Sequence, residues 1–132
     1  MSARFTMPIT AVESDIDEVG HVSNIVYVRW VNDVAMEHSR ALGWDYAAYK
    51  AFGAVFMVRR HEIDYIAQVT LGQTLSAETW VDEWRQASCI RKTELIRDSK
   101  VVVRAATTWA LISLGSGRPI RIPDEMREKF VA

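Results

Sequence analysis

Apolar residues between Ile25 and Leu42 recur at the spacing of an α-helix. At 100° per residue, one broad face of this helix carries Tyr27, Trp30, Val31, Val34, Ala35, His38, Ala41 and Leu42. Val26, Val28 and Met36 fall outside that face, so we expect more than one side of the helix to be covered. The pattern therefore predicts a long helix that lies deep in the fold.

Residues suited to helix ends flank this segment. Ser23 or Asn24 can cap the first turn by accepting an amide hydrogen bond, and Gly43 suits the left-handed conformation that commonly ends a helix. The next stretch, residues 43–50, predicts a short helical turn. Near the end of the chain a final amphipathic turn, DEMREKF, follows Pro123.

Elsewhere the pattern alternates between apolar and polar residues, as it does in β-strands. A first strand over residues 4–12 contains Pro8, which confines it to an edge of a sheet or to a bulge. Four further strands, rich in Val, Ile, Thr and aromatic residues, are predicted over residues 53–66, 73–84, 87–98 and 101–114. Short polar or Gly-containing joints separate these four segments, which favours antiparallel neighbours.

This order of elements, one strand, a long apolar helix and then four strands, predicts an α+β fold. We expect a single domain over residues 1–132, in which an antiparallel sheet wraps around one long central helix. A sheet of this size leaves its own far face and its edge strands uncovered. We therefore expect the chain to form at least a dimer.

Composition argues against several classes of function. A net charge of −1 over 132 residues gives no general attraction to nucleic acid or anionic membranes, and no run of ~18 apolar residues could span a bilayer. Cys89 is the only cysteine, so a disulfide within the chain is impossible, and no metal-binding spacing occurs. Because the N-terminus also lacks a signal-peptide pattern, these features favour a cytoplasmic protein without a bound metal.

Three carboxylates, a glycine and a histidine stand immediately before the long helix, in the segment SDIDEVGHVSN (residues 14–24). The first-turn N–H groups of a helix lack partners and lie at the positive end of its dipole, so they can stabilise an oxyanion. Asp17 is the best placed carboxylate to act as general base or nucleophile, and Gly20 would let a substrate approach the backbone. Taken alone, however, such residues more often have structural roles: their side chains bind nearby backbone groups in turns or complement the dipole of the following helix.

Four stretches distributed over nearly the whole chain favour a catalytic role for this loop over a structural one. They are DEVGHV (17–22), NIVYVRW (24–30), EWRQAS (83–88) and GRPIRIP (117–123). In these stretches the chain resembles the hot-dog-fold acyl-CoA thioesterases, specifically those similar to 4-hydroxybenzoyl-CoA thioesterase. The resemblance implies the hot-dog fold, hydrolysis of a coenzyme A thioester, and assembly into a homodimer or homotetramer.

The resemblance also implies roles for individual residues. Asp17 corresponds to the catalytic carboxylate, which acts on the thioester carbonyl or activates water, and the amide of Gly20 or His21 would polarise that carbonyl. The motifs place Asn24 and Ser88 at the substrate. Basic side chains that match coenzyme A positions of the family are Arg85, Arg118 and Arg121. No metal or cofactor is implied, because thioester hydrolysis needs only a carboxylate, an oxyanion stabiliser and water.

Two other functions stay open at this stage. A hot-dog hydratase or dehydratase would need an Asp and a His at one substrate carbon, which Asp17 and His21 could supply, although the pattern D-x-N-P-x-H is missing. A non-catalytic acyl-CoA-binding module would keep the fold without the chemistry. The stretch GHVSN also resembles the GHVNN-type branch of the thioesterases more than the 4-hydroxybenzoyl-CoA enzyme, so the sequence leaves the acyl group open.

The remaining polar residues of interest favour structural explanations. Asp15 and Glu18 are expected to be solvated, and Asp33 to be a polar partner for a neighbouring strand. His38, in the middle of the apolar helix face, is expected to be a neutral core histidine with satisfied hydrogen bonds. Cys89 is expected to act as a small buried hydrophobe.

Overall fold

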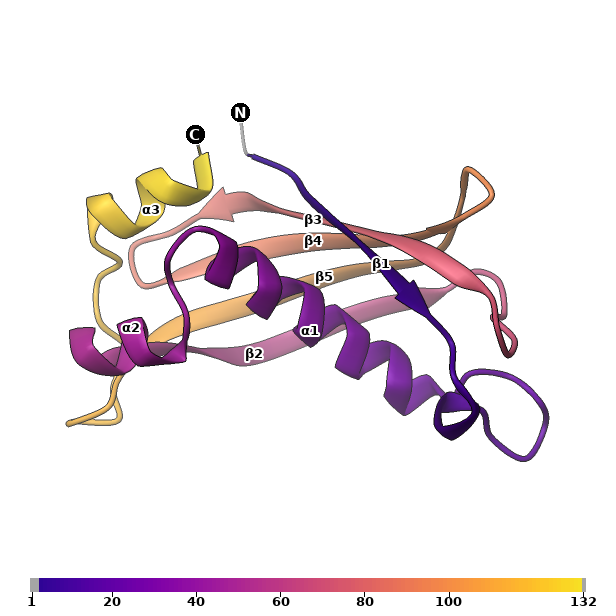
Figure 1. Cartoon of the computed structure of the whole chain (residues 1–132). Helices are drawn as coiled ribbons and strands as arrows, with labels where there is room; N and C mark the ends of the chain where they lie inside the picture. Colours follow the sequence, from indigo (N-terminus) through magenta and orange to yellow (C-terminus); the bar gives the residue numbers. More distant parts are fainter. Residues whose placement is uncertain (1–2, 132) are drawn as a thin grey trace.

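The computed structural model describes residues 3–131, which form a five-stranded antiparallel sheet with three α-helices (Figure 1). In chain order the elements are β1 (Phe5–Thr10), the 3₁₀ turn η1 (Glu13–Asp15), α1 (Asn24–Ala41), α2 (Tyr46–Phe52), β2 (Ala54–Tyr65), β3 (Thr74–Trp84), β4 (Ser88–Arg97), β5 (Lys100–Ser113) and α3 (Asp124–Val131). Each predicted strand and helix is present with similar bounds. The turn η1 was not expected from the sequence.

The strands lie in the order β1-β3-β4-β5-β2, so β1 and β2 form the two edges of the sheet. Pro8, which pairs with Ser76 of β3, therefore lies in an edge strand, as predicted. The strands β3, β4 and β5 are antiparallel neighbours in sequence order. In contrast, β2 precedes them in the chain but pairs with β5, which leaves its other side uncovered by this protomer.

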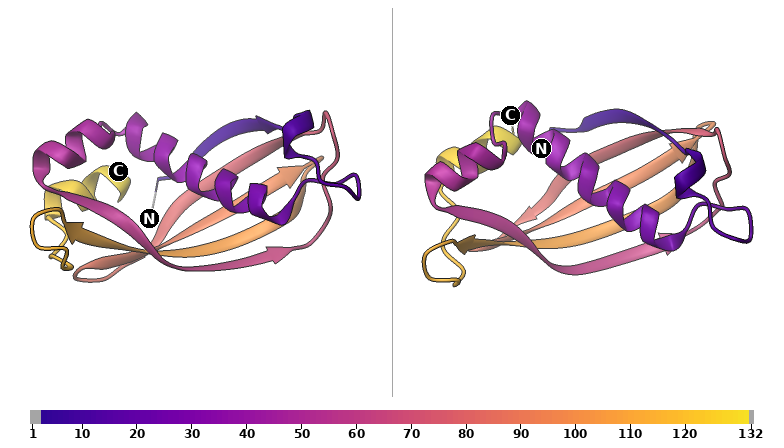
Figure 2. Two further views of the ribbon diagram at one scale, coloured as in Figure 1. Left: turned by 90° about the horizontal axis from the view of Figure 1, so that it is seen from below. Right: turned by 60° about the horizontal axis from the view of Figure 1, so that its bottom comes forward.

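The sheet curves around α1, which lies along one of its faces, while α2 and α3 lie together at one end (Figure 2). Register shifts interrupt β2 between Val58 and Arg60 and β3 between Val81 and Glu83. Such bulges bend a strand and increase its twist, which suits a sheet that wraps around a helix. The predicted α+β fold, with the sheet around one long helix, is confirmed.

The ends and the buried face of α1 follow the sequence pattern. Ser23 is the N-cap, with its Oγ accepting a hydrogen bond of 3.4 Å from the Ile25 amide, and Gly43 has the left-handed φ of 90°. The expected face is buried at Tyr27, Trp30, Val31, Val34, Ala35 and His38. Val26 is buried as well, whereas Met36 is exposed. None of the helices within residues 3–131 has the length and apolar character needed to cross a membrane.

The hydrophobic core has two parts, one toward each end of α1. Near its first half, Val26 and Val34 pack with residues of β3, β4 and β5 such as Leu75 and Leu95. Toward its C-terminal end, under α2 and α3, the core is built mainly around aromatic rings, including Trp44, Phe56, Trp84 and Phe130. Each part borders one of the two cavities described below.

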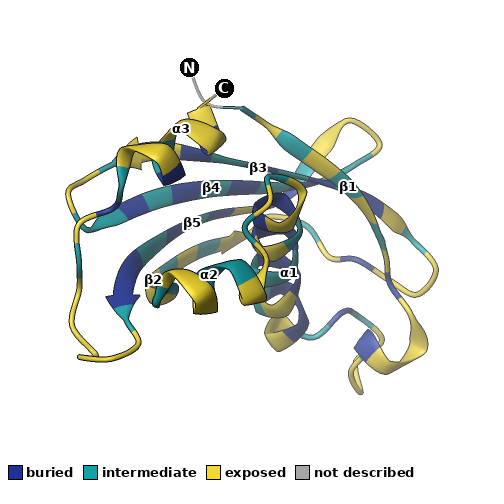
Figure 3. Ribbon diagram, turned by 60° about the vertical axis from the view of Figure 1, so that its left-hand side comes forward, coloured by how far each residue is buried: buried dark blue, intermediate teal, exposed yellow. Residues whose placement is uncertain are grey.

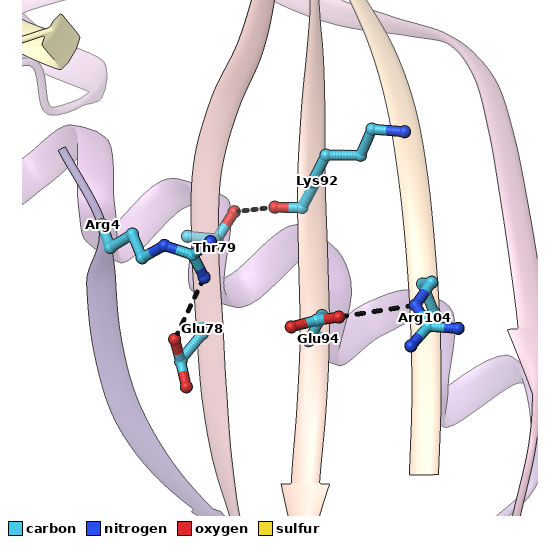
Figure 4. A network of polar contacts seen from close by, with 6 residues as sticks. All are labelled: Arg4, Glu78, Thr79, Lys92, Glu94 and Arg104. Atoms are coloured by element: carbon cyan, nitrogen blue, oxygen red, sulfur yellow. Dashed lines mark hydrogen bonds and ion pairs between the residues drawn. The ribbon is translucent and has the colours of Figure 1, made fainter. Parts of the chain in front are cut away.

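The face of the sheet away from α1 carries charged residues paired across strands (Figure 4). Arg4 forms an ion pair of 3.4 Å with Glu78, and Arg104 forms one of the same length with Glu94. Ion pairs of exposed side chains contribute only about 0–1 kcal/mol each. These pairs therefore support the sheet surface and do not indicate a site on this face.

Candidate active site

Asp15 anchors the loop that precedes α1. Its side chain is only 2% exposed, its Oδ2 accepts from the Val12 amide at 3.0 Å, and its Oδ1 accepts from Arg29 Nη2 at 2.7 Å. The expectation that Asp15 is solvated was wrong, because η1 turns this carboxylate inward and the second turn of α1 supplies the arginine. Glu18 is exposed, as expected.

Asp17 is held by the turn that follows it. Its Oδ1 accepts from the amides of Val19 at 3.0 Å and His21 at 3.4 Å, and its own amide donates to the His21 carbonyl at 2.9 Å. Gly20 completes the turn with a φ of 86°, a left-handed conformation that glycine adopts without strain. The structure gives Asp17 Oδ2 no partner within residues 3–131, so this oxygen can face a substrate.

The amides near the helix start differ in their availability. The Gly20 amide donates to the Asp17 carbonyl at 3.1 Å, and the His21 amide is directed at the Asp17 carboxylate. By contrast, the amide of Asn24, the first residue of α1, has no acceptor in the described part of the chain. The positive end of the helix is therefore accessible at Asn24, and the Gly20 and His21 amides shape the turn that holds Asp17.

A cleft lies beside these groups, at the first turn of α1. One wall comes from the loop and the helix start and includes Asp17, His21, Asn24, Ile25 and Tyr27. The other wall comes from the end of β2 and the segment behind it: Tyr65, Ile66, Ala67 and Gln68. The hydroxyl of Tyr27 accepts from the Val69 amide at 3.1 Å, which joins the two walls, and burial raises the pKa of this phenol.

The sequence did not indicate the second wall of the cleft. Residues 65–68 are distant from Asp17 along the chain and carry no motif, and only the closure of the sheet brings them beside the helix start. Tyr27 was expected on the apolar helix face, but nothing in the sequence indicated that its hydroxyl would bind the Val69 amide.

Large apolar side chains around the cleft are exposed in the single protomer. Val19 and Ile25 are 73% and 80% exposed, and Tyr65 and Ile66 continue this apolar surface to the end of the edge strand β2. Contiguous exposed apolar surface commonly marks an interaction site. The arrangement fits a cleft that a neighbouring molecule covers.

The other predicted site residues lie at the opposite end of the sheet. Arg85, in the turn before β4, forms an ion pair of 2.8 Å with Glu83, and its amide donates to the carbonyl of Ser88, the first residue of β4. Arg118 and Arg121 are exposed in the segment after β5. A hydrogen bond from the Ile122 amide to the Gln86 carbonyl, 2.8 Å long, ties that segment to the turn of Arg85.

The structure thus brings Arg85, Ser88, Arg118 and Arg121 to one end of the sheet, but it does not bring them to Asp17 within one protomer. The two groups are separated by the length of α1, whose 18 residues span about 27 Å (Figure 1). Asn24 is the predicted substrate-contacting residue that does line the cleft with Asp17.

His38 is a neutral core histidine, as predicted. Its side chain is 2% exposed, its Nδ1 lies 2.9 Å from Arg91 Nη1, and its ring stacks on Phe5 at 5.3 Å. Burial and the nearby Arg91 lower the pKa of His38 from 6.5 to about 4. Because an arginine can only donate, the Nδ1 of His38 accepts this hydrogen bond and its proton is on Nε2.

The pKa of His38 predicts how stability depends on pH. Between pH 6.5 and about 4 the unfolded chain binds a proton at this residue and the folded chain does not, so stability falls as the pH falls through this window. The loss amounts to about 3 kcal/mol at most. In His38→Asn, which keeps an acceptor near the Nδ1 position, urea unfolding should show a correspondingly weaker pH dependence. Parallel pH profiles for the two proteins would contradict the assignment.

Two further predictions can be compared with the structure. Cys89 is 4% exposed, which confirms that it is buried as expected, and burial raises the pKa of its thiol to about 11. Asp33 is half-buried on α1, and no hydrogen bond or ion pair joins its side chain to another residue in the described range. The expectation of a polar partner on a neighbouring strand was therefore wrong.

The chain is similar to known proteins over nearly its whole length. A family model described as the Thioesterase-like superfamily matches residues 13–130. The chain is 25% identical over 127 residues to the acyl-CoA thioesterase YbgC of Haemophilus influenzae, covering 96% of this chain and 93% of that protein.

Solved structures show the same fold. A candidate oleoyl thioesterase from Lactobacillus plantarum superposes with a TM-score of 0.94 at 13% identity, over 98% of this chain and 51% of that one, so this chain spans about half of its length. A DHNA-CoA thioesterase from Staphylococcus aureus superposes with a TM-score of 0.87 at 18% identity, over 96% of this chain and 88% of that one. The predicted hot-dog fold is confirmed.

Proposed function

Because the chain belongs to the Thioesterase-like superfamily, we propose that it hydrolyses an acyl-CoA thioester to a free acid and coenzyme A, with Asp17 as the reacting carboxylate. It is a thioester hydrolase, as are the relatives it matches. One observation carries the assignment of the site: the free Oδ2 of Asp17 and the unpartnered amide of Asn24 border the same cleft at the start of α1.

The proposed reaction begins with the thioester carbonyl beside the first turn of α1. Asp17 either removes a proton from the attacking water or attacks the carbonyl carbon itself. The carbonyl oxygen gains negative charge as the new bond forms, and the Asn24 amide at the positive end of the helix stabilises it. The C–S bond then breaks, and the sulfur leaves as coenzyme A after taking up a proton. If water attacked, the free acid forms in this step; if Asp17 attacked, its carboxylate holds the acyl group as an anhydride, which a water molecule then hydrolyses to the free acid and the original carboxylate.

The turn that follows Asp17 orients its carboxylate group. The amides of Val19 and His21 bind Oδ1 and hold the carboxylate, which leaves Oδ2 without a hydrogen-bond partner within the described residues. The side chain of His21 lines the cleft, where it can hold the attacking water or contact the carbonyl group. In this proposal Asp17 and the Asn24 amide act on the substrate, and Gly20 acts through the turn.

We also propose that two chains form the complete site. An edge strand such as β2 readily pairs with a copy of itself, and a two-fold axis makes that pairing antiparallel. The end of β2 at Tyr65 would then lie beside the partner's beginning of β2. This places the partner's arginine-bearing end of the sheet near the cleft, where Arg85, Arg118 and Arg121 can bind the phosphates of coenzyme A.

The experiment that tests the function is a thiol-release assay over short, long and aromatic acyl-CoAs. We expect free coenzyme A to appear with at least one class, and the preferred class then defines the acyl group. Crotonyl-CoA serves as a control for the alternative chemistry. Loss of its double bond without thiol release would indicate a hydratase, and tight acyl-CoA binding with neither reaction would indicate a binding module. Either result would overturn the proposal.

A further inference from the structure

A second cavity, of about 290 Å³, lies at the opposite end of α1 from Asp17, between α1, α2 and the sheet. Figure 3 shows how these elements are arranged. Its walls are mainly apolar and include the aromatic residues Trp44, Phe56, Trp84, Trp109 and Phe130. Met36 and Tyr46, which also line it, are exposed and mark its opening to solvent. Its volume is near the lower end of ligand pockets, which span roughly 300–1,000 Å³. The hydrolysis described above makes no use of this cavity within its own protomer.

A buried arginine borders this cavity without a counter-ion. Arg91 is 5% exposed, and its Nη1 donates to His38 Nδ1 at 2.9 Å and to Thr79 Oγ1 at 3.1 Å. Within residues 3–131 no carboxylate forms an ion pair with Arg91. Burial lowers the pKa of Arg91 to about 10, so it is still charged at neutral pH. A buried cation of this kind is unfavourable unless an anion neutralises it.

Two donors without partners belong to the same cavity. Trp84 and Trp109 line it, and the indole N–H of each is buried with no acceptor in the described chain. The hydroxyls of Ser39 and Tyr49 are bonded to each other at 2.5 Å, and burial raises the pKa of Tyr49 to about 12, so this phenol is neutral. The two unpartnered indole N–H groups and the charged Arg91 thus supply hydrogen-bond donors around a mainly apolar cavity.

We infer that this cavity binds a compact organic carboxylate. The carboxylate group accepts hydrogen bonds from Arg91, and an aromatic or branched body lies among the rings of Trp44, Trp84 and Trp109. The ligand has two sources: a free carboxylic acid, or the distal end of a carboxylate-bearing acyl group held at the partner's Asp17 in the proposed dimer, since Asp17 of the same chain is a helix length away. The first source goes beyond the proposed function and does not depend on it, whereas the second rests on it.

The first test uses benzoate and its neutral analogue benzyl alcohol, followed through the indole N–H resonances of the five tryptophans. Benzoate should shift the resonances of Trp84 and Trp109 and leave that of Trp80 unchanged, because Trp80 faces Arg4 on the other side of the sheet. Benzoate should bind at least about tenfold more tightly than benzyl alcohol. No shift at Trp84 and Trp109, or equal affinity for the two compounds, would overturn the inference.

The second test removes the donors one at a time. Arg91→Met should lower benzoate affinity about tenfold or more and abolish the preference over benzyl alcohol, while the matched change Arg104→Met on the far face should do neither. Trp84→Phe and Trp109→Phe keep the rings and should each weaken benzoate binding about threefold, with Trp80→Phe as their control. These two variants keep the inference testable if Arg91→Met does not fold, and unchanged benzoate binding in both would overturn it.

The third test separates the two sources. The variant Asp17→Asn is titrated with glutaryl-CoA and with butyryl-CoA, which ends in a methyl group. Shifts at Trp84 and Trp109 with glutaryl-CoA but not with butyryl-CoA would identify the end of an acyl group as a ligand, and shifts with benzoate but with neither acyl-CoA would identify a free acid. If no acyl-CoA is hydrolysed by the unaltered protein, only the proposed function fails, because benzoate binding is measured without turnover.

Discussion

Asp17→Asn is expected to lower the rate of thioester hydrolysis by a factor of about 100 or more, while the protein folds as before. The asparagine amide oxygen can still accept from the Val19 amide, so the turn is kept, but the side chain can no longer take a proton or attack the carbonyl carbon. The measurement is kcat with the best acyl-CoA from the thiol-release assay, together with the midpoint of urea unfolding.

The matched control is Glu18→Gln, the neighbouring carboxylate. Glu18 is exposed and does not line the cleft, so this variant should retain activity within about twofold of the unaltered protein. Equal losses in both variants would show that the net charge of the loop matters instead of the position of one carboxylate. Full activity in Asp17→Asn would remove Asp17 from the mechanism.

Mixed dimers are expected to regain activity from two impaired variants. One parent carries Asp17→Asn, and the other carries Arg85→Ala, Arg118→Ala and Arg121→Ala, which should raise KM at least about tenfold by removing charge-assisted hydrogen bonds to phosphate. If each site combines Asp17 of one chain with the arginines of its partner, a mixed dimer contains one intact site. Random mixing of equal amounts should then restore about one quarter of the normal activity.

The control for the recovery of activity is a mixture of the two variants that have each folded as homodimers. Refolding or co-expressing the two variants together should give the recovery, whereas simply adding the two folded homodimers should give little until their subunits exchange. If the arginines and Asp17 served the same site within one chain, or if the arginines had no role, no mixture would exceed the activity expected from its components. Sizing of the unaltered protein at several concentrations would establish the dimer independently.

The sequence predicted most of the architecture because local patterns depend on neighbours along the chain. The period of 3.6 residues identified α1, the alternating runs identified the strands, and Pro8 placed β1 at an edge. Burial of the expected face of α1 followed from the same period. What local patterns could not show was how the loop before α1 folds, and the expectation for Asp15 was wrong for that reason.

Contacts between segments that are distant in sequence determined the features that local patterns could not predict. Asp15 is buried because Arg29 reaches back from the helix, and the cleft exists because the end of β2 closes against the helix start. Neither contact leaves a trace in residue spacing, since each depends on how the sheet curves. The same holds for Arg91, whose position in an alternating strand indicates a face of the sheet but not the absence of a carboxylate opposite it.

The sequence by itself determined the elements, their order and the identity of the candidate carboxylate, because helix period, strand alternation and the DEVGHV motif are properties of consecutive residues. Only the tertiary structure decided which amide is free, which walls enclose Asp17, and that the predicted arginines lie a helix length away from it. Hydrogen bonds and cavities join residues that are far apart in sequence, and their geometry is set only when the sheet has closed around the helix.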